Sequence, residues 1–327
     1  MSIALESINL SSSSNTPGAC PVCLATGPFP RRPSTEPFLL FECPSCGIVF
    51  LFPQPHESQL ASYYDETYYG EDRKKFLSAL QIAIDGLNSW KWRKLQRLLH
   101  PTGRMLDIGC GRGTLVKQAR NAGYEAYGLE RESPVGHSVP GILYKSLPEC
   151  HFPDGHFQLV VLWHVLEHLS DPVSTLREIN RVLAPGGWLS VAVPNYGGAQ
   201  AKASGANWFH LDLPRHLWHF RPESLERLLL GCGFQIRRRS KFSLEYDWFG
   251  TLQSWMNSAL DDRNTLYSFL KGSEKPRSGS LGRIAASAAL TIPALLNVLW
   301  DGFCGRGGTL EFLLQKTASS TDCRPAQ

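Results

Sequence analysis

The fold of this chain is decided by the stretch Met105-Leu106-Asp107-Ile108-Gly109-Cys110-Gly111-Arg112-Gly113-Thr114. An apolar strand ends in an acid, passes through three glycines at alternate positions, and enters a helix that Gly123 ends. Glycine allows a positive φ and lets a ligand lie against the backbone, and the helix beyond the loop begins with unpaired N–H groups that suit an anion. The stretch therefore predicts a binding site for a small, partly anionic ligand.

The spacing of the glycines narrows the choice of ligand. The dinucleotide fingerprint requires a third glycine where this chain has Thr114, and a phosphate-binding P-loop requires Gly-Lys-Ser/Thr, which is absent here. A second strand follows from Tyr124 to Leu129 and ends at Glu130. An acid at that position is placed to hold two ribose hydroxyls. The order of acid, glycines and acid thus indicates a ligand that contains a ribose.

Two further motifs follow in order along the chain. A buried strand at 157–162 leads into Trp163-His164-Val165-Leu166-Glu167-His168-Leu169 and then Asp171-Pro172, a helix N-cap with a first-turn proline. Ala184-Pro185-Gly186-Gly187 then turns into a strand that ends at Pro194-Asn195. Together these motifs resemble class I S-adenosylmethionine-dependent methyltransferases, in the branch that includes the ubiquinone-type O-methyltransferases and many bacterial glycan-associated enzymes. The resemblance covers residues 88–240 and a last strand at 309–316.

The resemblance implies an α/β fold with a Rossmann-like seven-stranded sheet and helices on both faces. It also implies S-adenosylmethionine as the cofactor, bound by Asp107, Gly109, Cys110, Gly111, Glu130 and His164. Displacement at a sulfonium carbon needs mainly alignment and, for some acceptors, a base. His164 and His216 are the candidate bases. The segment 208–221 resembles the "D-x-PRHLxHF" stretch of the same branch, so Arg215, His216 and His219 are expected to face the substrate; a packing role for the histidines stays open.

The residues His164-x-x-Glu167-His168 permit other interpretations. They match the inverted zinc-peptidase motif, but they follow a buried strand inside a methyltransferase scaffold, which does not suit a peptidase. Some relatives place Glu-x-x-Glu-His here and bind a divalent ion beside a vicinal diol. This chain has His164 in place of the first glutamate of that pattern.

The N-terminal region contains a cysteine module. Cys20-x2-Cys23 and Cys43-x2-Cys46 are two pairs at the spacing of a zinc ribbon, with short apolar strands at 38–41 and 48–51. A redox pair would not explain two copies at this spacing. We expect a structural zinc ion bound by the four thiolates, in a module whose hydrophobic centre is separate from that of the methyltransferase core. A similar ribbon precedes the core of sugar C-methyltransferases, which also have a large C-terminal domain.

Composition limits the compartment and the partners. The net charge of +4 is mild and does not indicate nucleic acid. Nine cysteines, an odd number, argue against a secreted disulfide framework, and residues 1–16 are polar and lack a secretory pattern. We therefore expect a cytoplasmic protein. The predicted organisation is a disordered N-terminus (1–16), a zinc ribbon (17–55), linker and cofactor-covering helices (56–100), the core (101–240), a helical insertion or lid (241–308), the last core strand (309–316) and a tail (317–327).

The late insertion includes an apolar segment. Residues 284–300 carry no charge, but seventeen residues fall short of the ~20 that span a bilayer. A lid over the pocket and peripheral contact with the inner membrane surface through 284–300 are both open. We expect methyl transfer to a small-molecule, glycan or lipid-linked acceptor, with oxygen as the acceptor atom. The alternatives are a non-catalytic cofactor-binding or partner-docking module, and a sugar C-methyltransferase without the usual C-terminal domain.

Overall fold

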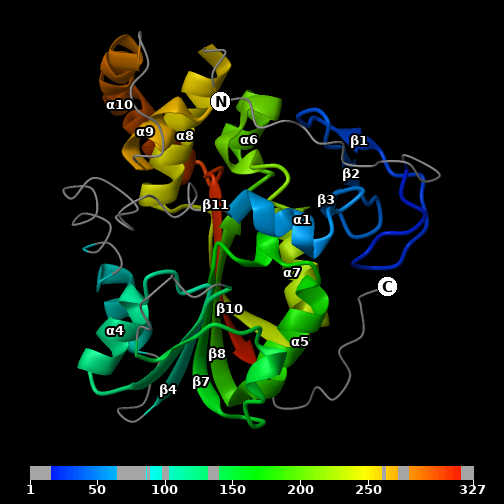
Figure 1. Cartoon of the computed structure of the whole chain (residues 1–327), viewed down its shortest axis with the longest axis vertical. Helices are drawn as coiled ribbons and strands as arrows, with labels where there is room; N and C mark the ends of the chain where they lie inside the picture. The colour runs from blue at the N-terminus through cyan, green and yellow to red at the C-terminus, as the bar shows by residue number, and fades with distance from the viewer. Residues whose placement is uncertain are drawn as a thin grey trace.

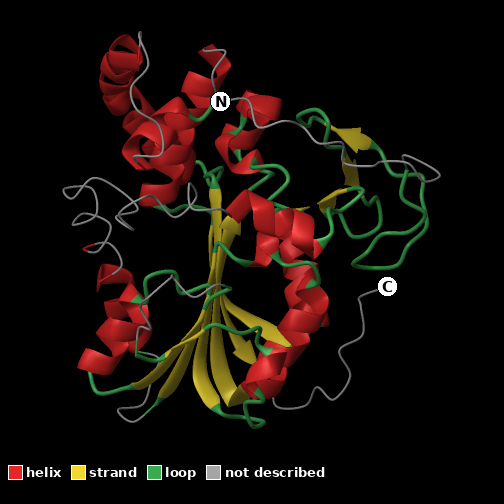
Figure 2. Cartoon of the chain, viewed as in Figure 1, coloured by secondary structure: helices red, strands yellow, loops and turns green. Residues whose placement is uncertain are grey.

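The computed structural model describes residues 16–64, 86, 89–97, 103–131, 140–259, 263–271 and 280–317. A large sheet with helices on both faces forms the body of the molecule, with a smaller sheet beside it and a cluster of helices at one end (Figures 1 and 2). Nearly all of the proposed disordered N-terminus and of the tail lies outside the described residues.

The large sheet has seven strands in the order β10-β11-β8-β7-β4-β5-β6. They are β4 (Arg104–Ile108), β5 (Glu125–Leu129), β6 (Ile142–Leu143), β7 (Phe157–Trp163), β8 (Leu183–Pro194), β10 (Phe234–Ser240) and β11 (Thr309–Lys316). The strands from β4 to β8 run parallel, and β11 is antiparallel to both β8 and β10. The predicted α/β fold with a seven-stranded sheet is confirmed. The strand order reverses between β4 and β7, and ligands bind at such a switch point.

Alternation along the strands explains why both faces of the sheet are covered. Met105, Leu159 and Val161 face a cluster that includes Leu115 and Val116 of α4 (Thr114–Asn121). The intervening side chains face the opposite cluster, which includes residues of α5 (Pro172–Val182) and α7 (Pro222–Gly231). Residues 89–96 are also helical and add Trp92 to the first cluster. Central strands buried on both faces read as continuous apolar runs, as these do.

The smaller sheet corrects one expectation about the cysteine module. Its order is β1-β2-β3-β9, where β1 (Arg31–Arg32), β2 (Leu40–Glu42) and β3 (Val49–Leu51) come from the module, but β9 (Trp218–His219) comes from the core region. Phe50 and Trp218 are register partners across the β3–β9 pair. A single buried cluster contains Phe41 and Phe50 together with core residues such as Val160.

The expectation of separate hydrophobic centres is therefore wrong. Every residue of β3 is fully buried. A ribbon of two or three short strands cannot bury both of its own faces, so its second face packs against the core.

The insertion before β11 is helical in the described residues. It comprises α8 (Leu244–Ala259), α9 (Thr265–Lys271) and α10 (Ser280–Phe303) (Figure 1). These helices form a small hydrophobic core of their own, which includes Leu252, Met256 and Ala294. Thr309 of β11 is the register partner of Pro194, so the insertion rejoins the sheet at the carboxyl end of β8. Within the described ranges, we find no helix of sufficient length and apolarity to cross a membrane.

Short helices complete the connections. They are α1 (Glu57–Ala61), α6 (Ala199–Ser204) and the 3-10 turns Ser62–Tyr64, Pro148–Cys150, Leu166–His168, Gly205–Asn207 and Phe209–Leu211. Two of these turns carry histidines: Leu166–His168 contains His168, and Phe209–Leu211 contains His210. They follow β7 and β8, at the carboxyl edge of the sheet.

Candidate active site

The glycine loop after β4 has one tightly packed glycine and one open one. Gly109 and Gly111 have φ values of +70° and +54°. A Cβ added to Gly109 would lie 2.2 Å from the Cγ2 atom of Val165, so this position needs glycine because the next strand connection passes close by. A Cβ added to Gly111 would meet no atom within 4 Å among the described residues. The space beside Gly111 is therefore open to a ligand, and this open space is called the cradle.

Two acids lie beside this cradle. Asp107 is buried, and burial together with the charge of Glu130 raises the pKa of Asp107 to about 8. Glu130 accepts hydrogen bonds from the backbone N–H of Gly111 at 2.7 Å and of Arg131 at 2.9 Å. Two neighbouring carboxyl groups that repel each other favour a ligand that carries positive charge.

Cys110 helps to shape the loop by packing and does not supply a reactive thiolate. A Cβ added to Gly128 would lie 2.6 Å from the Sγ atom of Cys110, so this side chain packs against β5. Burial raises the pKa of the thiol, which stays protonated at neutral pH. The backbone N–H of Cys110 donates to the carbonyl of Leu129 at 3.1 Å.

His164 lies at the carboxyl end of β7 in a left-handed conformation, with φ of +54°. Its N–H donates to the carbonyl of Ala192 at 2.8 Å, which fixes the backbone there. Its Nδ1 atom is 3.5 Å from Oε1 of Glu167, and its ring lies 3.9 Å, centroid to centroid, from the ring of Tyr246. A non-glycine residue held in this conformation is costly, and such residues concentrate at functional sites.

Glu167, His168 and His216 form a compact buried cluster. One ligand atom from each of the three lies within 4.8 Å of the others. Glu167 is 1% exposed, and neither of its carboxylate oxygens has a hydrogen-bond partner in the described part of the chain. Burial raises the pKa of Glu167 to about 7. The Nδ1 atoms of His168 and His216 are paired with the carbonyls of Arg215 and His210, at 3.0 and 2.8 Å.

These hydrogen bonds define the state of the two rings. With Nδ1–H donating to a carbonyl, Nε2 carries the lone pair and can accept a proton or bind a metal. Burial lowers the pKa of His168, His210 and His216 to about 4 and that of His219 to about 3. The imidazoles are therefore neutral at physiological pH.

The side chains of the other two predicted substrate residues, Arg215 and His219, have hydrogen-bond partners within the protein. The guanidinium of Arg215 is paired with Asp212, with Nε 3.1 Å from Oδ2. Burial opposes ionisation of Asp212, but the charges of Arg215 and His216 outweigh it and lower its pKa to about 2. His219 is buried in β9, with Nε2 paired to the carbonyl of Leu211 at 3.2 Å. His216 is thus the predicted substrate residue that belongs to the cluster with Glu167.

The backbone of the β9 segment holds this cluster and also joins the ribbon. Leu217 donates its N–H to the carbonyl of Glu167 at 2.8 Å, and its own carbonyl accepts the N–H of Leu51 at 2.9 Å. The indole N–H of Trp218 donates to the carbonyl of Leu169 at 2.6 Å. Arg221 makes two contacts with Glu42 of the ribbon, at 2.6 and 2.8 Å. These contacts lie in the interface between the ribbon and the core, which is called the ribbon seam.

The helical insertion supplies site residues that sequence reasoning missed. Tyr246 of α8 covers His164, and Gly250 approaches His210 so closely that a Cβ would lie 2.5 Å from its Nε2. Gln200 of α6 joins the two parts: its amide donates to the carbonyl of Asp247 at 3.0 Å and its oxygen accepts the indole N–H of Trp208 at 2.7 Å. The polar residues of the otherwise apolar helix α8 were the available sequence signal, but they do not show which part of the protein the helix contacts.

The four cysteines of the ribbon come together as their spacing predicts. The Sγ atoms of Cys20 and Cys46 are 3.7 Å apart and those of Cys23 and Cys43 are 3.5 Å apart, and all four lie within 4.8 Å of one another. A tetrahedron with Zn–S bonds of 2.3 Å has edges of about 3.8 Å. All four are free thiols. The hydrogen bond from Cys46 lowers the pKa of Cys20 to about 5 and raises that of Cys46, so the pair shares a proton.

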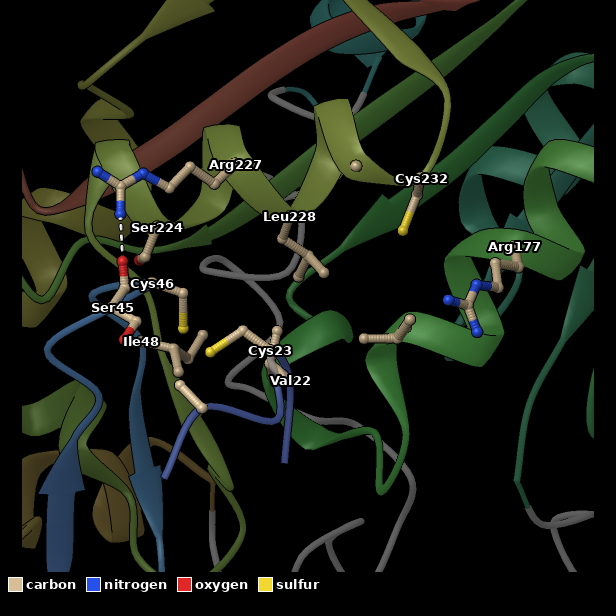
Figure 3. Close-up of a pocket in the computed structure, with 13 residues that line it drawn as sticks. Val22, Cys23, Ser45, Cys46, Ile48, Arg177, Ser224, Arg227, Leu228 and Cys232 are labelled. Atoms are coloured by element: carbon tan, nitrogen blue, oxygen red, sulfur yellow. Dashed lines mark hydrogen bonds between the residues drawn. The ribbon is translucent and has the colours of Figure 1, made fainter. Parts of the chain in front are cut away.

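A cavity of about 490 Å³ lies along the seam between the ribbon and helices α5 and α7 (Figure 3). Cys23 and Cys46 reach its wall, and Arg227 crosses beside it to the carbonyl of Ser45 at 2.7 Å. Its lining includes none of the residues predicted to bind the cofactor or the substrate. The cavity is a feature of the ribbon seam rather than of the glycine loop.

Comparison with known proteins agrees with this geometry. A methyltransferase domain model matches residues 78–238. The chain is 25% identical over 218 residues to a ubiquinone biosynthesis O-methyltransferase of Xanthomonas axonopodis pv. citri, covering 60% of this chain and 86% of the relative. It is 36% identical over 149 residues to a probable S-adenosylmethionine-dependent methyltransferase of Mycolicibacterium smegmatis, covering 43% and 56%.

Among solved structures, a methyltransferase from Archaeoglobus fulgidus superimposes with a TM-score of 0.45 at 19% identity, covering 71% of this chain and 94% of that one. The domain match and the sequence relatives define the class. This chain is a class I S-adenosylmethionine-dependent methyltransferase, with S-adenosylmethionine as its cofactor. The matched domain begins after the ribbon.

Proposed function

We propose that the protein transfers the methyl group of S-adenosylmethionine to an oxygen atom of its acceptor, at the cluster formed by Glu167, His168 and His216. In this reaction the acceptor oxygen forms a bond to the methyl carbon as the sulfur–carbon bond breaks. S-adenosylhomocysteine leaves, and the hydroxyl proton passes to Nε2 of His216. Nδ1–H of His216 donates to the carbonyl of His210, so Nε2 carries the lone pair that would accept this proton.

The observation that carries the proposal is the carboxylate of Glu167. It is buried without a hydrogen-bond partner in the described residues, next to two neutral imidazoles and at the carboxyl edge of the sheet. A buried carboxyl group that lacks a partner is costly unless a ligand, proton or ion completes it. A polar group of the bound acceptor would supply the missing partner. Relatives named ubiquinone biosynthesis O-methyltransferase support oxygen as the acceptor atom.

We assign the cofactor to the cradle beside Gly111. Asp107 and Glu130 would hold its positively charged groups and its ribose hydroxyls, and Gly109 lets the loop pass close to Val165. His164, whose Nδ1 atom is 3.5 Å from Oε1 of Glu167, would line the path of the methyl group, and Cys110 would shape the loop. Tyr246 covers His164 and would help to exclude water from the reaction.

A divalent cation also fits the same cluster. One carboxylate and two imidazoles that each donate Nδ1–H to a carbonyl form a plausible ligand set with its supporting hydrogen bonds. Such an ion would supply positive charge that stabilises an ionised acceptor oxygen. In that case Glu167, His168 and His216 would bind the ion, and the acceptor would need a low pKa or two adjacent oxygens.

The four cysteines would hold a structural zinc ion. Their sulfur separations match a tetrahedral site, and a closed set of four thiolates leaves no position for chemistry. Cysteines that bind a metal ion instead of forming disulfides are typical of proteins in a reducing compartment, so we propose that the protein is cytoplasmic. The role of the ion would be to hold the ribbon against β9.

The acceptor would be a small molecule, a glycan intermediate or a lipid-linked precursor. Incubating the protein with methyl-labelled S-adenosylmethionine and fractions of a cell extract should label one acceptor, and NMR of the product should show an O-methyl group. His216→Asn should abolish transfer while the affinity for S-adenosylmethionine stays unchanged. His151→Asn, which changes a histidine outside the cluster, is the matched control.

Other outcomes of this experiment would favour the alternatives. A C-methyl product would support a sugar C-methyltransferase, and binding of the cofactor without labelling of any fraction would support a non-catalytic docking module. Full activity of His216→Asn would refute the proposed role of the cluster.

A further inference from the structure

Lys91 is a buried charged residue that has no part in the proposed reaction. It lies in the helix at 89–96 and is only 9% exposed. Its ammonium pairs with the carboxylate of Glu245, which lies 154 positions further along the chain in α8, and Nζ is 3.9 Å from Oε1 of Glu311 in β11. A lysine is almost never fully buried unless its charge is paired. This ion pair therefore joins the helix at 89–96 to the helical insertion.

Two aromatic rings complete the surroundings of this ammonium. Nζ of Lys91 lies 5.1 Å from the ring centroid of Trp163 and 4.7 Å from that of Tyr246. Trp163 is the last residue of β7, and its indole N–H donates to the hydroxyl of Ser190 at 2.9 Å, which fixes the ring. A cation within about 6 Å of the centre of an aromatic face is attracted to it, more strongly where water is excluded. Two rings and two carboxylates thus hold the ammonium in one place.

The two rings belong to the two halves of the candidate site. Trp163 packs against the same hydrophobic cluster as Cys110 of the glycine loop. Tyr246 lies 3.9 Å, centroid to centroid, from the ring of His164. Lys91 therefore contacts one residue on the cofactor side and the residue that covers His164 on the other.

The helix at 89–96 is anchored on the cofactor side of the sheet. Trp92 packs in the cluster that contains Leu115 and Val116 of α4, the helix that follows the glycine loop. The amide of Gln118 on α4 donates to the hydroxyl of Ser89 at 2.7 Å. Lys91 thus reaches α8 from a helix that is itself held by packing and by a hydrogen bond.

The ion pair acts on the first turn of α8. Glu245 is the second residue of this helix, and Tyr246 follows it directly. The next residue, Asp247, accepts the N–H of Gly308 at 3.0 Å and so ties the same turn to the segment before β11. The contacts of Glu245 and Asp247 therefore fix the turn on both sides of Tyr246, and Lys91 also contacts the Tyr246 ring.

We propose that Lys91 is a positioning residue of the methyl transfer, because its pair with Glu245 keeps Tyr246 over His164. The Lys91–Glu245 ion pair is called the clasp. Removing the charge of Lys91 would leave Glu245 without its partner, which is costly for a charge that is largely buried, and the first turn of α8 would move toward solvent. Water would then reach His164, and transfer would slow although the cradle is intact. This role rests on the proposed placement of the reaction beside His164 and Glu167.

The NMR resonance of the His164 ring tests the clasp without an acceptor. The Tyr246 ring shifts the Hε1 proton of His164 in histidine-labelled protein; His164→Gln identifies this resonance, and Tyr246→Leu defines its position without the ring. Lys91→Met keeps most of the side-chain length and removes the charge, so it should move the resonance to the Tyr246→Leu position. Lys91→Arg keeps the charge and should leave the resonance in place. The matched control is Lys94→Met, which changes an exposed lysine on the same helix and should match the parent.

Two further measurements separate positioning from folding and from cofactor binding. The double variant Lys91→Met, Glu245→Gln removes both charges of the clasp, so its melting temperature should stay close to that of the parent while the His164 resonance still moves. At saturating methyl-labelled S-adenosylmethionine, Lys91→Met should label the acceptor fraction at least about tenfold more slowly than the parent. Its dissociation constant for S-adenosylmethionine should change by less than about threefold.

The outcomes distinguish the clasp from the proposed function. A His164 resonance that stays in place in both Lys91→Met and the double variant would overturn the proposal, as would an equal effect of Lys94→Met or an unchanged labelling rate. If the resonance moves but the parent labels no fraction, the clasp stands and the proposed function fails.

Discussion

Replacing Trp218 by alanine should destabilise the ribbon and the methyltransferase core together. Trp218 is 2% exposed, is the register partner of Phe50, and donates its indole N–H to the carbonyl of Leu169. It belongs to β9, whose neighbour Leu217 is bonded both to Leu51 of the ribbon and to Glu167 of the site. Removing this side chain opens the seam that joins the two parts.

The magnitude follows from complete burial. Truncating a buried Trp to Ala costs about 3–5 kcal/mol through lost apolar contact and the cavity left behind. At about 2.1 cal/mol/K per residue, unfolding of 327 residues has an entropy of about 0.7 kcal/mol/K, so the melting temperature should fall by about 4–7 °C. Trp300→Ala is the matched control: the same substitution at a side chain that is 59% exposed should change stability by no more than about 0.5 kcal/mol.

Calorimetry and hydrogen exchange provide the assay. One cooperative transition should move to lower temperature, and the amides of residues 164–169 should exchange faster although the substitution lies in another segment. Two separate transitions, with only a ribbon transition affected and the core transition unchanged, would refute the coupling. That result would restore the view that the two parts have independent hydrophobic centres.

Three further predictions concern the cofactor cradle, the buried glutamate and the metal. Gly111→Ala should weaken binding of S-adenosylmethionine at least about tenfold in calorimetry, because the new Cβ enters the open cradle. The control is Gly123→Ala, which is also at positive φ and in open space and should strain the backbone but leave the affinity unchanged. Equal affinity of the two variants would contradict the assignment of the cofactor to the cradle. The pKa of Glu167 is about 7 in the folded chain and near 4.5 in the unfolded chain, so the parent loses stability as the pH rises between those values. The melting temperature of Glu167→Gln relative to the parent should therefore rise from pH 5 to 7.5, by the equivalent of on the order of 3 kcal/mol. A difference that does not depend on pH would contradict the raised pKa of Glu167. Elemental analysis should find one zinc ion per chain, and Cys43→Ser should lower both zinc content and the protection of residues 164–169; zinc-free protein with full protection would disprove a structural ion.

Local chemistry made the fold and the cofactor loop predictable from the sequence. An apolar strand, three alternating glycines, a helix and an acid after the next strand need only near neighbours to specify a strand–loop–helix unit, and the structure has that unit at β4, α4 and β5. The four cysteines were equally readable, because C-x2-C places two thiols on one tight turn wherever it occurs. Gly109 needed glycine for a reason that the sequence did not show, the approach of Val165.

Assembly of the candidate acceptor site was not predictable in the same way. His216 was singled out with Arg215 and His219 by resemblance, but only His216 lies with Glu167, because Asp212 pairs with Arg215 and β9 buries His219. Tyr246 was missed altogether. A helical segment that packs over a site leaves no periodic signal of what it covers.

The sequence by itself predicted the glycine loop and the cysteine module from residues close together in the chain, and it predicted the class of enzyme and the seven-stranded sheet through the resemblance of its motifs to a known family. Tertiary structure alone decided that β9 completes the ribbon sheet, that the ribbon and core share one buried cluster, and that α8 covers His164. These contacts join residues up to about two hundred positions apart, as Glu42 and Arg221 are. They form because short strands and helices each have an apolar face that must be buried against another element, and sequence periodicity shows that face without naming its partner.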